Sequence, residues 1–397
     1  MIKSTKKKSL LFVLFLLLVL VTSYVQADDI KVISVNSSVK WQPTERGYIT
    51  YQFKVSSTGK MNVILKHKNL YSTDTYWTVE LLADDMDTVL QTYDSTGTDT
   101  TYTGASFGVT KGTYYVRVYA RKSCSHKFSD TPVTLNVKFV ESSNWEVEYN
   151  ASKKEGNNKQ GTATPLTLNK YKYGTIYSKS DVDYYTFKAK SDGYVTITFK
   201  HKNIYEADAY WTVQLVNSKT GVVYETTSAG TKKSLTTTTI GVSKGTYFVR
   251  ISCAGNNYSS VDYSVRVKYT KSSSWEQEYT SSTNKYNNSM SSANKLTVNK
   301  TMSGTLSTES DVDYMRFTIK SAGSVNIILS HKYIANAHTY YKISLYNSRT
   351  KLVTSFVSKG VDVAVSKSIK LSSGTYFVRI EKGAKWNSSP YKITVKK

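Results

Sequence analysis

The 397-residue sequence contains only two cysteines, four prolines and five histidines. Two cysteines are too few for a disulfide-rich scaffold or for a structural zinc site built mainly from thiolates. Beyond the N-terminus no long apolar run occurs, so no later membrane-spanning segment is indicated. Acidic residues are scarce as well, with 29 Asp and Glu against 53 Lys and Arg, a net charge of +24. Aromatic residues, in contrast, are abundant: 33 Tyr, 12 Phe and 6 Trp.

Residues 1–27 have the pattern of a secretory signal peptide. Lysines 3, 6, 7 and 8 precede an apolar run at 10–21, and small residues end the segment at Ala27. The run of about twelve residues is shorter than the roughly twenty that span a bilayer, so cleavage is favoured over an uncleaved anchor helix. We therefore expect an exported chain with a charge of about +20, secreted or held non-covalently at the cell surface.

Comparison of the sequence with itself reveals three copies of one unit. Phe53, Phe187 and Phe317 begin the same spaced pattern, at intervals of 134 and 130 residues. In each copy the phenylalanine is followed by a glycine, a histidine, an aromatic residue and finally a Gly-Thr-Tyr-aromatic-Val-Arg segment. The matching residues are Gly59, Gly193 and Gly323; His67, His201 and His331; Trp77, Trp211 and Tyr341; and Gly112, Gly245 and Gly374. Such a period indicates tandem domains and is too long for a solenoid repeat.

Inside each copy apolar residues alternate with polar ones, which is typical of half-buried strands. Val195, Ile197 and Phe199 show the alternation, and no long 3.6-residue period competes with it. Several short strands within about 120 residues predict an antiparallel β-sandwich. The predicted fold class is therefore all-β, with three tandem antiparallel, jelly-roll-like β-sandwiches at 28–140, 141–270 and 271–397. Serine-rich linkers are expected at 141–144 and 271–274.

Four motifs recur in the same order in the second and third copies. They are the acidic linkers at 146–150 and 276–279, the small-residue leads at 163–166 and 293–296, Asp-Val-Asp-Tyr at 181–184 and 311–314, and Gly-Thr-Tyr-Phe-Val-Arg at 245–250 and 374–379. Their order and spacing resemble the bacterial pre-peptidase C-terminal domain, and more distantly the collagen-binding domains of clostridial collagenases. The resemblance covers both copies and the later two-thirds of the first. It implies a sandwich module that usually accompanies a secreted hydrolase, yet three copies leave no room here for a catalytic domain.

The acidic motifs predict calcium sites in the second and third copies. Two segments supply hard oxygen ligands, as Ca²⁺ coordination requires, and the collagen-binding relatives use a similar linker and aspartates for calcium. The alternative is structural, with the carboxylates accepting backbone N–H bonds at a sandwich edge. The first copy has Gly47 and Ile49 in place of the aspartates, so no ion is expected there. The candidate ligands are Glu146, Glu148, Asn150, Asp181 and Asp183 in the second copy, and Glu276, Glu278, Asp311 and Asp313 in the third.

A stripe of aromatic and arginine side chains is a second candidate site. On the last motif strand these residues lie on the face opposite the core positions, where they could stack on sugars or peptide side chains and bind anions. The alternative is that both faces of the strand are packed. The candidates are Tyr115, Arg117 and Tyr119 with Tyr93 on a nearby strand, Phe248 and Arg250 in the second copy, and Phe377 and Arg379 in the third.

No catalytic residues are predicted. The repeated histidines share the parity of core positions, and no Ser or Cys is placed beside them for nucleophilic activation. Asp181 and Asp183 are two residues apart on one strand and cannot flank a glycosidic bond. Cys124 and Cys253 occupy non-equivalent positions; two free thiols are favoured over an inter-copy disulfide.

The sequence therefore predicts a secreted, non-enzymatic binding or adhesion protein. Its positive charge favours an anionic partner, and the expected ligands are anionic or neutral polysaccharide, a cell-wall polymer or an extracellular matrix protein. Specific nucleic-acid binding is not expected, because the lysines are scattered through all three copies. The alternative is a structural spacer, or an accessory scaffold for a separate secreted hydrolase.

Overall fold

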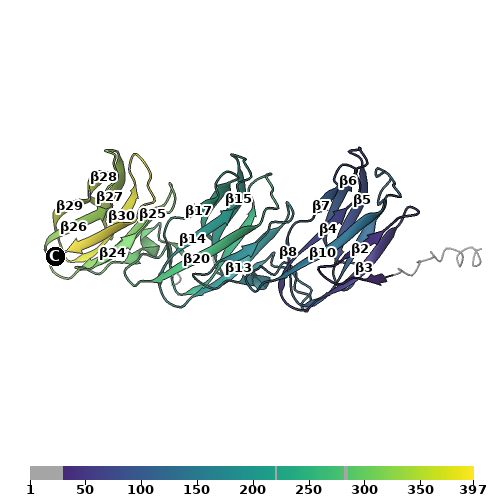
Figure 1. Cartoon of the computed structure of the whole chain (residues 1–397). Coiled ribbons are helices and arrows are strands. Elements are labelled where there is room, and N and C mark those ends of the chain that lie inside the picture. Colours follow the sequence, from purple (N-terminus) through teal and green to yellow (C-terminus); the bar gives the residue numbers. More distant parts are fainter. Residues whose placement is uncertain (1–29, 220, 281–284) are drawn as a thin grey trace, which may run out of the picture.

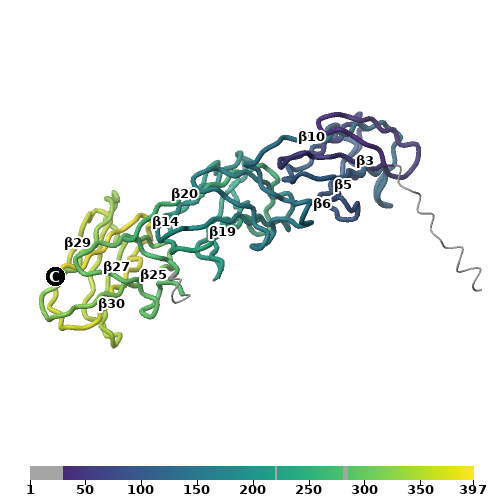
Figure 2. The backbone as a smooth tube through the Cα atoms, turned by 90° about the horizontal axis from the view of Figure 1, so that it is seen from below, coloured from purple at the N-terminus to yellow at the C-terminus, as the bar shows by residue number. Residues whose placement is uncertain are grey.

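The computed structural model of the protein describes residues 30–219, 221–280 and 285–397. The predicted signal peptide lies outside these residues. Three β-sandwiches follow one another along the chain, as two perpendicular views show (Figures 1 and 2). Within the described residues the regular structure is strand, apart from the short 3₁₀-helices η1 (Gln160–Thr162) and η2 (Met290–Ser292). The predicted all-β sandwich fold is confirmed.

Each sandwich has one five-stranded sheet and a second sheet packed against it. In the first sandwich the sheets are β1 (Ile30–Val32), β3 (Tyr48–Val55), β9 (Gly112–Tyr119), β5 (Thr75–Leu82) and β6 (Val89–Thr96), and β2 (Ser38–Trp41), β10 (Val133–Glu141), β4 (Gly59–Lys66) and β7 (Thr101–Thr103), with β8 (Phe107–Val109) also on β4.

The second sandwich repeats this order of strands. Its sheets are β11 (Thr164–Pro165), β13 (Val182–Ala189), β19 (Gly245–Cys253), β15 (Ala209–Asn217) and β16 (Gly221–Ala229), and β12 (Lys172–Gly174), β20 (Tyr263–Lys271), β14 (Gly193–His201) and β17 (Ser234–Thr236), with β18 (Ile240–Val242) on β14.

In the third sandwich a single long strand takes the place of the last two. Its sheets are β23 (Asn294–Lys295), β25 (Val312–Ile319), β30 (Gly374–Lys382), β27 (Thr339–Asn347) and β28 (Leu352–Lys359), and β24 (Thr301–Gly304), β31 (Tyr391–Lys396), β26 (Gly323–His331) and β29 (Ala364–Leu371). A small hairpin of β21 (Tyr279–Thr280) and β22 (Lys285–Tyr286) precedes it.

The pairing is antiparallel except at one edge of each five-stranded sheet. There the short strands β1, β11 and β23 pair in parallel with their neighbours, a detail that the alternating pattern did not predict. β9, β19 and β30 each lie in the middle of such a sheet, with a neighbouring strand on both sides. This central position determines how the side chains on their outer face are covered.

The alternating apolar residues form one core in each sandwich. Val195, Ile197 and Phe199 are fully buried in the second. The repeated phenylalanines stack on the tyrosine of the Gly-Thr-Tyr segment, with ring centroids 5.7–5.9 Å apart in all three. Burying each such side chain contributes about 1.5–3 kcal/mol. The residues that repeat in the sequence are therefore mainly residues of the three cores.

The linker between the first two sandwiches is hydrogen-bonded to both of them. The backbone N–H of Tyr149 donates to Gly108 of the first sandwich (3.0 Å), and that of Glu146 donates to Tyr173 of the second (2.8 Å). At the next junction Glu276 donates to Ser303 in the same way (2.8 Å). A Cβ atom on Gly108 would lie 2.2 Å from the carbonyl oxygen of Glu146, so only glycine allows this close approach.

No helix in the described part of the chain is long and apolar enough to cross a membrane.

Candidate metal centres and binding surfaces

Two clusters of carboxylates lie where a linker meets the sandwich that follows it. Glu146 and Glu148 are both buried, on either side of the partly exposed Val147, and Asp183 reaches them from the start of β13. One carboxylate oxygen from each of these three lies within 4.8 Å of the others. In the third sandwich a related trio, Glu278, Asp311 and Asp313, meets the same limit; it includes the counterpart of Asp181 in place of that of Glu146. The structure thus brings together side chains that the acidic motifs predicted to be neighbours.

The carboxylates of both clusters are buried. Glu146, Glu148, Asp181 and Asp183 and their counterparts Glu276, Glu278, Asp311 and Asp313 are each at most 5% exposed. No lysine or arginine of the described residues forms an ion pair with any of them. Burying several like charges without a cation costs many kcal/mol, so such groups take up protons or bind a cation.

Some of the carboxylate oxygens have ordinary hydrogen-bond donors. Glu146 accepts from the backbone of Thr175 (2.7 Å) and from the hydroxyl of Tyr185 (2.6 Å). Asp183 accepts from the hydroxyl of Tyr263 and from the amide of Asn157 (3.0 Å). These bonds fix the orientation of two carboxylates from outside the cluster.

The third sandwich has the same donors with one exception. Glu276 accepts from the backbone of Thr305 (2.5 Å), and Tyr391 donates to both Glu276 (3.0 Å) and Asp313 (2.6 Å). Met315 stands in place of Tyr185, so one hydroxyl donor is lost. The carboxylates of the third sandwich therefore accept fewer hydrogen bonds than those of the second.

Other oxygens of the clusters have no donor at all. Oε2 of Glu148, Oε1 of Glu278 and Oδ1 of Asn157 are buried and lack a hydrogen-bond partner among the described residues. An unpaired buried oxygen is costly, and carboxylate oxygens of Glu148 and Glu278 left without a donor beside other carboxylates suit a cation. This observation is independent of the carboxylate count.

Burial raises the pKa of every carboxyl group in both clusters. Desolvation raises the pKa of Glu146 to about 8. Desolvation, with the nearby charges of Asp181 and Asp183, holds the pKa of Glu148 well above its usual range. The same cause acts on the pKa of each of Asp181, Asp183, Glu276, Glu278, Asp311 and Asp313. In a cation-free protein these groups therefore keep their protons to a higher pH than exposed carboxyl groups do.

The ligand set fits calcium. All the candidate ligands are oxygens, their number reaches that of a Ca²⁺ site once water is added, and neither thiolate nor imidazole is present. Glu146, Glu148 and Asp183 would hold the ion in the second sandwich, with Asp181 and Asn157 beside them. Glu278, Asp311 and Asp313 would hold it in the third, with Glu276 and Asn287.

Asn150, a ligand predicted from the sequence, does not lie in the cluster. The chain turns at this residue, and the side chain accepts from the backbone N–H groups of Ser152 and Lys153 (both 3.2 Å) in an exposed turn. Asn157, which sequence reasoning missed, is fully buried against Asp183. The sequence does contain a sign of its role. Asn157 and Asn287 are 130 residues apart, the same offset that relates the acidic residues of the two copies, and Asn287 donates to Asp313.

We expect Asn157→Ala to weaken calcium binding to the second sandwich by about tenfold, because outer contacts that orient metal ligands typically contribute that much. Isothermal titration calorimetry on the full chain measures it. Asn150→Ala is the matched control and should leave the affinity unchanged. Equal effects of the two variants would contradict the assignment.

The described residues of the first sandwich form no corresponding cluster. Ile49, at the position of Asp183, is buried in the core, and Gly47 stands at the position of Asp181. Among the described residues only the second and third sandwiches bring together three metal-ligating side chains.

The predicted aromatic and arginine stripe is less exposed than expected. Tyr115 and Phe248 are buried, at 8% and 7% exposure, because strands on both sides of β9 and β19 cover them. Gln52 donates to the hydroxyl of Tyr115 (2.7 Å), and the ring of Tyr184 meets Phe248 edge-on. The prediction that Tyr115 and Phe248 are exposed for ligand stacking is therefore wrong.

The remaining stripe residues are partly exposed but hold contacts with neighbours. Arg117 lies over the ring of Tyr48 (5.1 Å), and Tyr119 donates to Glu80 (3.3 Å). Arg250 donates to Gln214 (3.0 Å), and Arg379 pairs with Glu381 (2.6 Å). Phe377, next to Arg379 in alternation, is also only partly exposed.

Tyr93, expected beside the stripe, faces the interior instead. It belongs to the core of the first sandwich, stacks on Tyr102 at 4.4 Å and donates its hydroxyl to Val63 (3.1 Å). Its position on β6 has core parity, and the strand pairing that shows this was not visible in the sequence.

The repeated histidines are structural, as predicted. The ring of His201 lies tilted against that of Trp211, with centroids 3.9 Å apart, and its ring nitrogens bond to the carbonyl of Lys202 (2.6 Å) and the hydroxyl of Ser228 (3.2 Å). His67 and His331 repeat both hydrogen bonds. Cys124 is exposed and Cys253 partly exposed, and both are free thiols.

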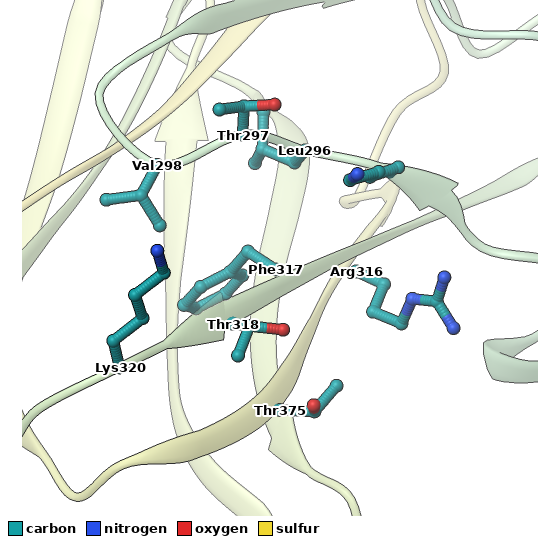
Figure 3. Close-up of a pocket in the computed structure, with 9 residues that line it drawn as sticks. Leu296, Thr297, Val298, Arg316, Phe317, Thr318, Lys320 and Thr375 are labelled. Carbon is teal, nitrogen blue, oxygen red and sulfur yellow. The ribbon is translucent and has the colours of Figure 1, made fainter.

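A basic groove of about 580 Å³ lies at the edge of the third sandwich. Lys295, Arg316 and Lys320 line it around an apolar base, and no acidic residue lines it. Figure 3 shows Arg316 and Lys320 on opposite sides of Phe317. The second sandwich has Pro165 and Thr186 in place of the first two, so this concentration of charge belongs to the third.

Comparison with known proteins gives only distant similarities. No family model and no curated protein matches the chain. One similar solved structure is a pre-peptidase C-terminal domain. It belongs to a collagenase from Bacillus anthracis, is 17% identical, and has a TM-score of 0.23 over 26% of this chain and 94% of its own.

Two other solved structures show a similar degree of likeness. A periplasmic inhibitor of g-type lysozyme from Aeromonas hydrophila is 17% identical over 29% of this chain and all of its own, with a TM-score of 0.20. The CUB1-EGF-CUB2 domains of rat MASP-1 are 12% identical over 59% of this chain and 99% of their own, with a TM-score of 0.18.

Proposed function

We propose that the protein is an exported, non-catalytic binding protein that holds an anionic extracellular polymer, such as an acidic polysaccharide or cell-wall polymer, on the basic surface of its three sandwiches. The observation that carries the proposal is the separation of charge between interior and surface. Eight of the 29 acidic side chains are buried in the two clusters, which leaves at most 21 at the surface. Beyond residue 27 the chain has 49 Lys and Arg. A partner therefore meets a surface more basic than the net charge suggests, which favours anions.

The basic groove of the third sandwich supports the same function. Three cationic side chains around a shallow apolar base can bind the charged groups of a polymer while its apolar parts contact Leu296 and Val298. None of the three forms an ion pair within the described residues, so their charges are available to a ligand.

The metal centres have a supporting role in this proposal. Calcium, when bound, supplies positive charge that offsets the buried carboxylates. Glu146 and Glu148 come from the linker and Asp183 from the next sandwich, so the ligands of one centre join two segments. The first and third sandwiches would in this way keep their positions relative to the second.

Binding to immobilised polygalacturonate and poly(glycerol phosphate), with dextran as the neutral comparison, tests the function. We expect affinity for both polyanions to fall steeply between 50 and 300 mM salt, because contacts between opposite charges are screened. The variant K295Q/R316Q/K320Q should bind about tenfold more weakly. The control K351Q/K367Q/K370Q removes three exposed charges elsewhere on the same sandwich and should change affinity much less.

Two results would contradict the proposal. Absence of binding to any polyanion at 50 mM salt would favour the structural spacer or accessory scaffold. Tighter binding to dextran than to the polyanions would show that charge does not select the ligand.

A further inference from the structure

A cleft of about 570 Å³ opens where the second and third sandwiches meet. Tyr194 on β14 and Thr239 line it from the second sandwich, Trp275 from the linker, and Ser303, Lys332 and Lys392 from the third. This volume is within the roughly 300–1,000 Å³ of small-molecule sites.

The linker and the third sandwich together contribute a row of neighbouring side chains to the cleft. Trp275 forms a bridge with Ser303, which pairs with Lys392, which in turn pairs with Ser330. Adjacent strands lie about 4.8 Å apart, so these four positions extend for about 14 Å across one sheet face. The ring of Tyr194 contacts that of Trp275, with centroids 4.3 Å apart.

At the junction of the first and second sandwiches, the side chains at the corresponding positions contact one another. Tyr173 stands where Ser303 does, and its ring stacks almost parallel to that of Trp145 at 6.2 Å. Lys60 stands where Tyr194 does; it lies 4.6 Å from the Trp145 ring and pairs with Asp262 at 3.0 Å. That junction is held by contacts among its own side chains.

The second junction lacks these contacts. Serine at 303 provides no ring to stack on Trp275, and proline at 390 replaces the acid of the ion pair. Lys332 and Lys392 are exposed and form no ion pair among the residues described. An aromatic pair, two lysine side chains and several hydroxyl groups therefore line the same open cleft.

We propose that this cleft binds a sugar ring with an anionic substituent, with the ring packed on Tyr194 and Trp275 and the anion bound by Lys332 and Lys392. The C–H face of a sugar ring is apolar enough to pack on an aromatic ring, while its hydroxyl groups need partners such as Ser303, Ser330 and Thr239. The anion is either a carboxylate or a phosphate. The inference takes its class of ligand from the proposed function but concerns a site separate from the basic groove.

The test uses the chain's other junction as a template. The variant Y194K/S303Y/P390D gives the second junction the residues that fill the first. Isothermal titration of the full chain with tetragalacturonate, its carboxyl-reduced form and galactose 6-phosphate measures binding. We expect the wild type to bind at least one of the two anionic probes at least tenfold more tightly than the neutral one, and whichever binds more tightly identifies the anion.

The filled variant should lose at least tenfold in affinity at an unchanged melting temperature. K332A/K392A, which alters only exposed side chains, should abolish the preference for the anionic probes. Wild-type protein that binds neither anionic probe, or a folded filled variant that binds as tightly as wild type, would overturn the inference. Retention on immobilised polygalacturonate is measured in parallel, because its loss contradicts the proposed function, whereas its persistence without binding of the small probes contradicts only the cleft.

Discussion

Calcium added to the EDTA-treated protein is expected to raise the melting temperature of the second and third sandwiches by about 10 °C. A ligand present at a hundred times its dissociation constant stabilises the folded state by about 2.7 kcal/mol. For domains of this size each kcal/mol corresponds to roughly 3–5 °C. Differential scanning calorimetry over a range of calcium concentrations measures the shift. The transition of the first sandwich, which has no cluster, should move much less.

The control for this prediction keeps the shape of the clusters and removes charge. Glu148→Gln with Asp183→Asn, and Glu278→Gln with Asp313→Asn, should abolish the calcium shift. At pH 8 the cation-free melting temperature of this variant should rise, because the four amides stay neutral at a pH where the buried carboxyl groups begin to lose protons and repel each other. An undiminished calcium shift in the variant would show that the ion binds elsewhere.

Without calcium, the stability of the same two sandwiches should fall as the pH rises from about 4 to 8. Burial raises the pKa of these carboxyl groups in the folded state, that of Glu146 to about 8, whereas unfolded Asp and Glu titrate near 4. The folded state therefore binds more protons over this range, and stability is lost as the pH rises through the folded pKa values. Chemical denaturation in EDTA at several pH values measures it.

Saturating calcium should reverse this dependence. The ion binds the deprotonated carboxylates, so its contribution grows over the same pH range. Wild-type protein whose stability in EDTA increases between pH 5 and 8 would contradict the assignment of protonated, buried clusters.

The repeated core was predictable from the sequence because each buried residue leaves a periodic signal. Phe187, Val195 and Trp211 have counterparts in the other copies, and all of them are in the cores. The acidic clusters were predictable because the acidic linker and the Asp-Val-Asp-Tyr motif recur together in the second and third copies.

Other features depend on turns and neighbours that periodicity does not record. Asn150 is predicted as a further oxygen ligand of the acidic linker, but the chain turns there and its side chain bonds to the turn instead. Tyr115 was expected at the surface because its parity is opposite to that of Tyr114. Burial of that outer face comes from side chains such as Gln52 on the adjacent strand, which is far away in sequence.

The linker between the first two sandwiches, which is hydrogen-bonded to both of them, has a consequence for how the basic surfaces of the sandwiches can bind one polymer together. A flexible linker lets neighbouring domains take many relative orientations. A linker hydrogen-bonded through Tyr149 to the first sandwich and through Glu146 to the second restricts those orientations. When the first sandwich is bound to a polymer, the effective concentration of the other two is then high only for polymer segments that lie along one direction. Avidity would depend on the stiffness of the ligand: an extended polymer could engage all three modules together, while a compact one of equal charge could engage one.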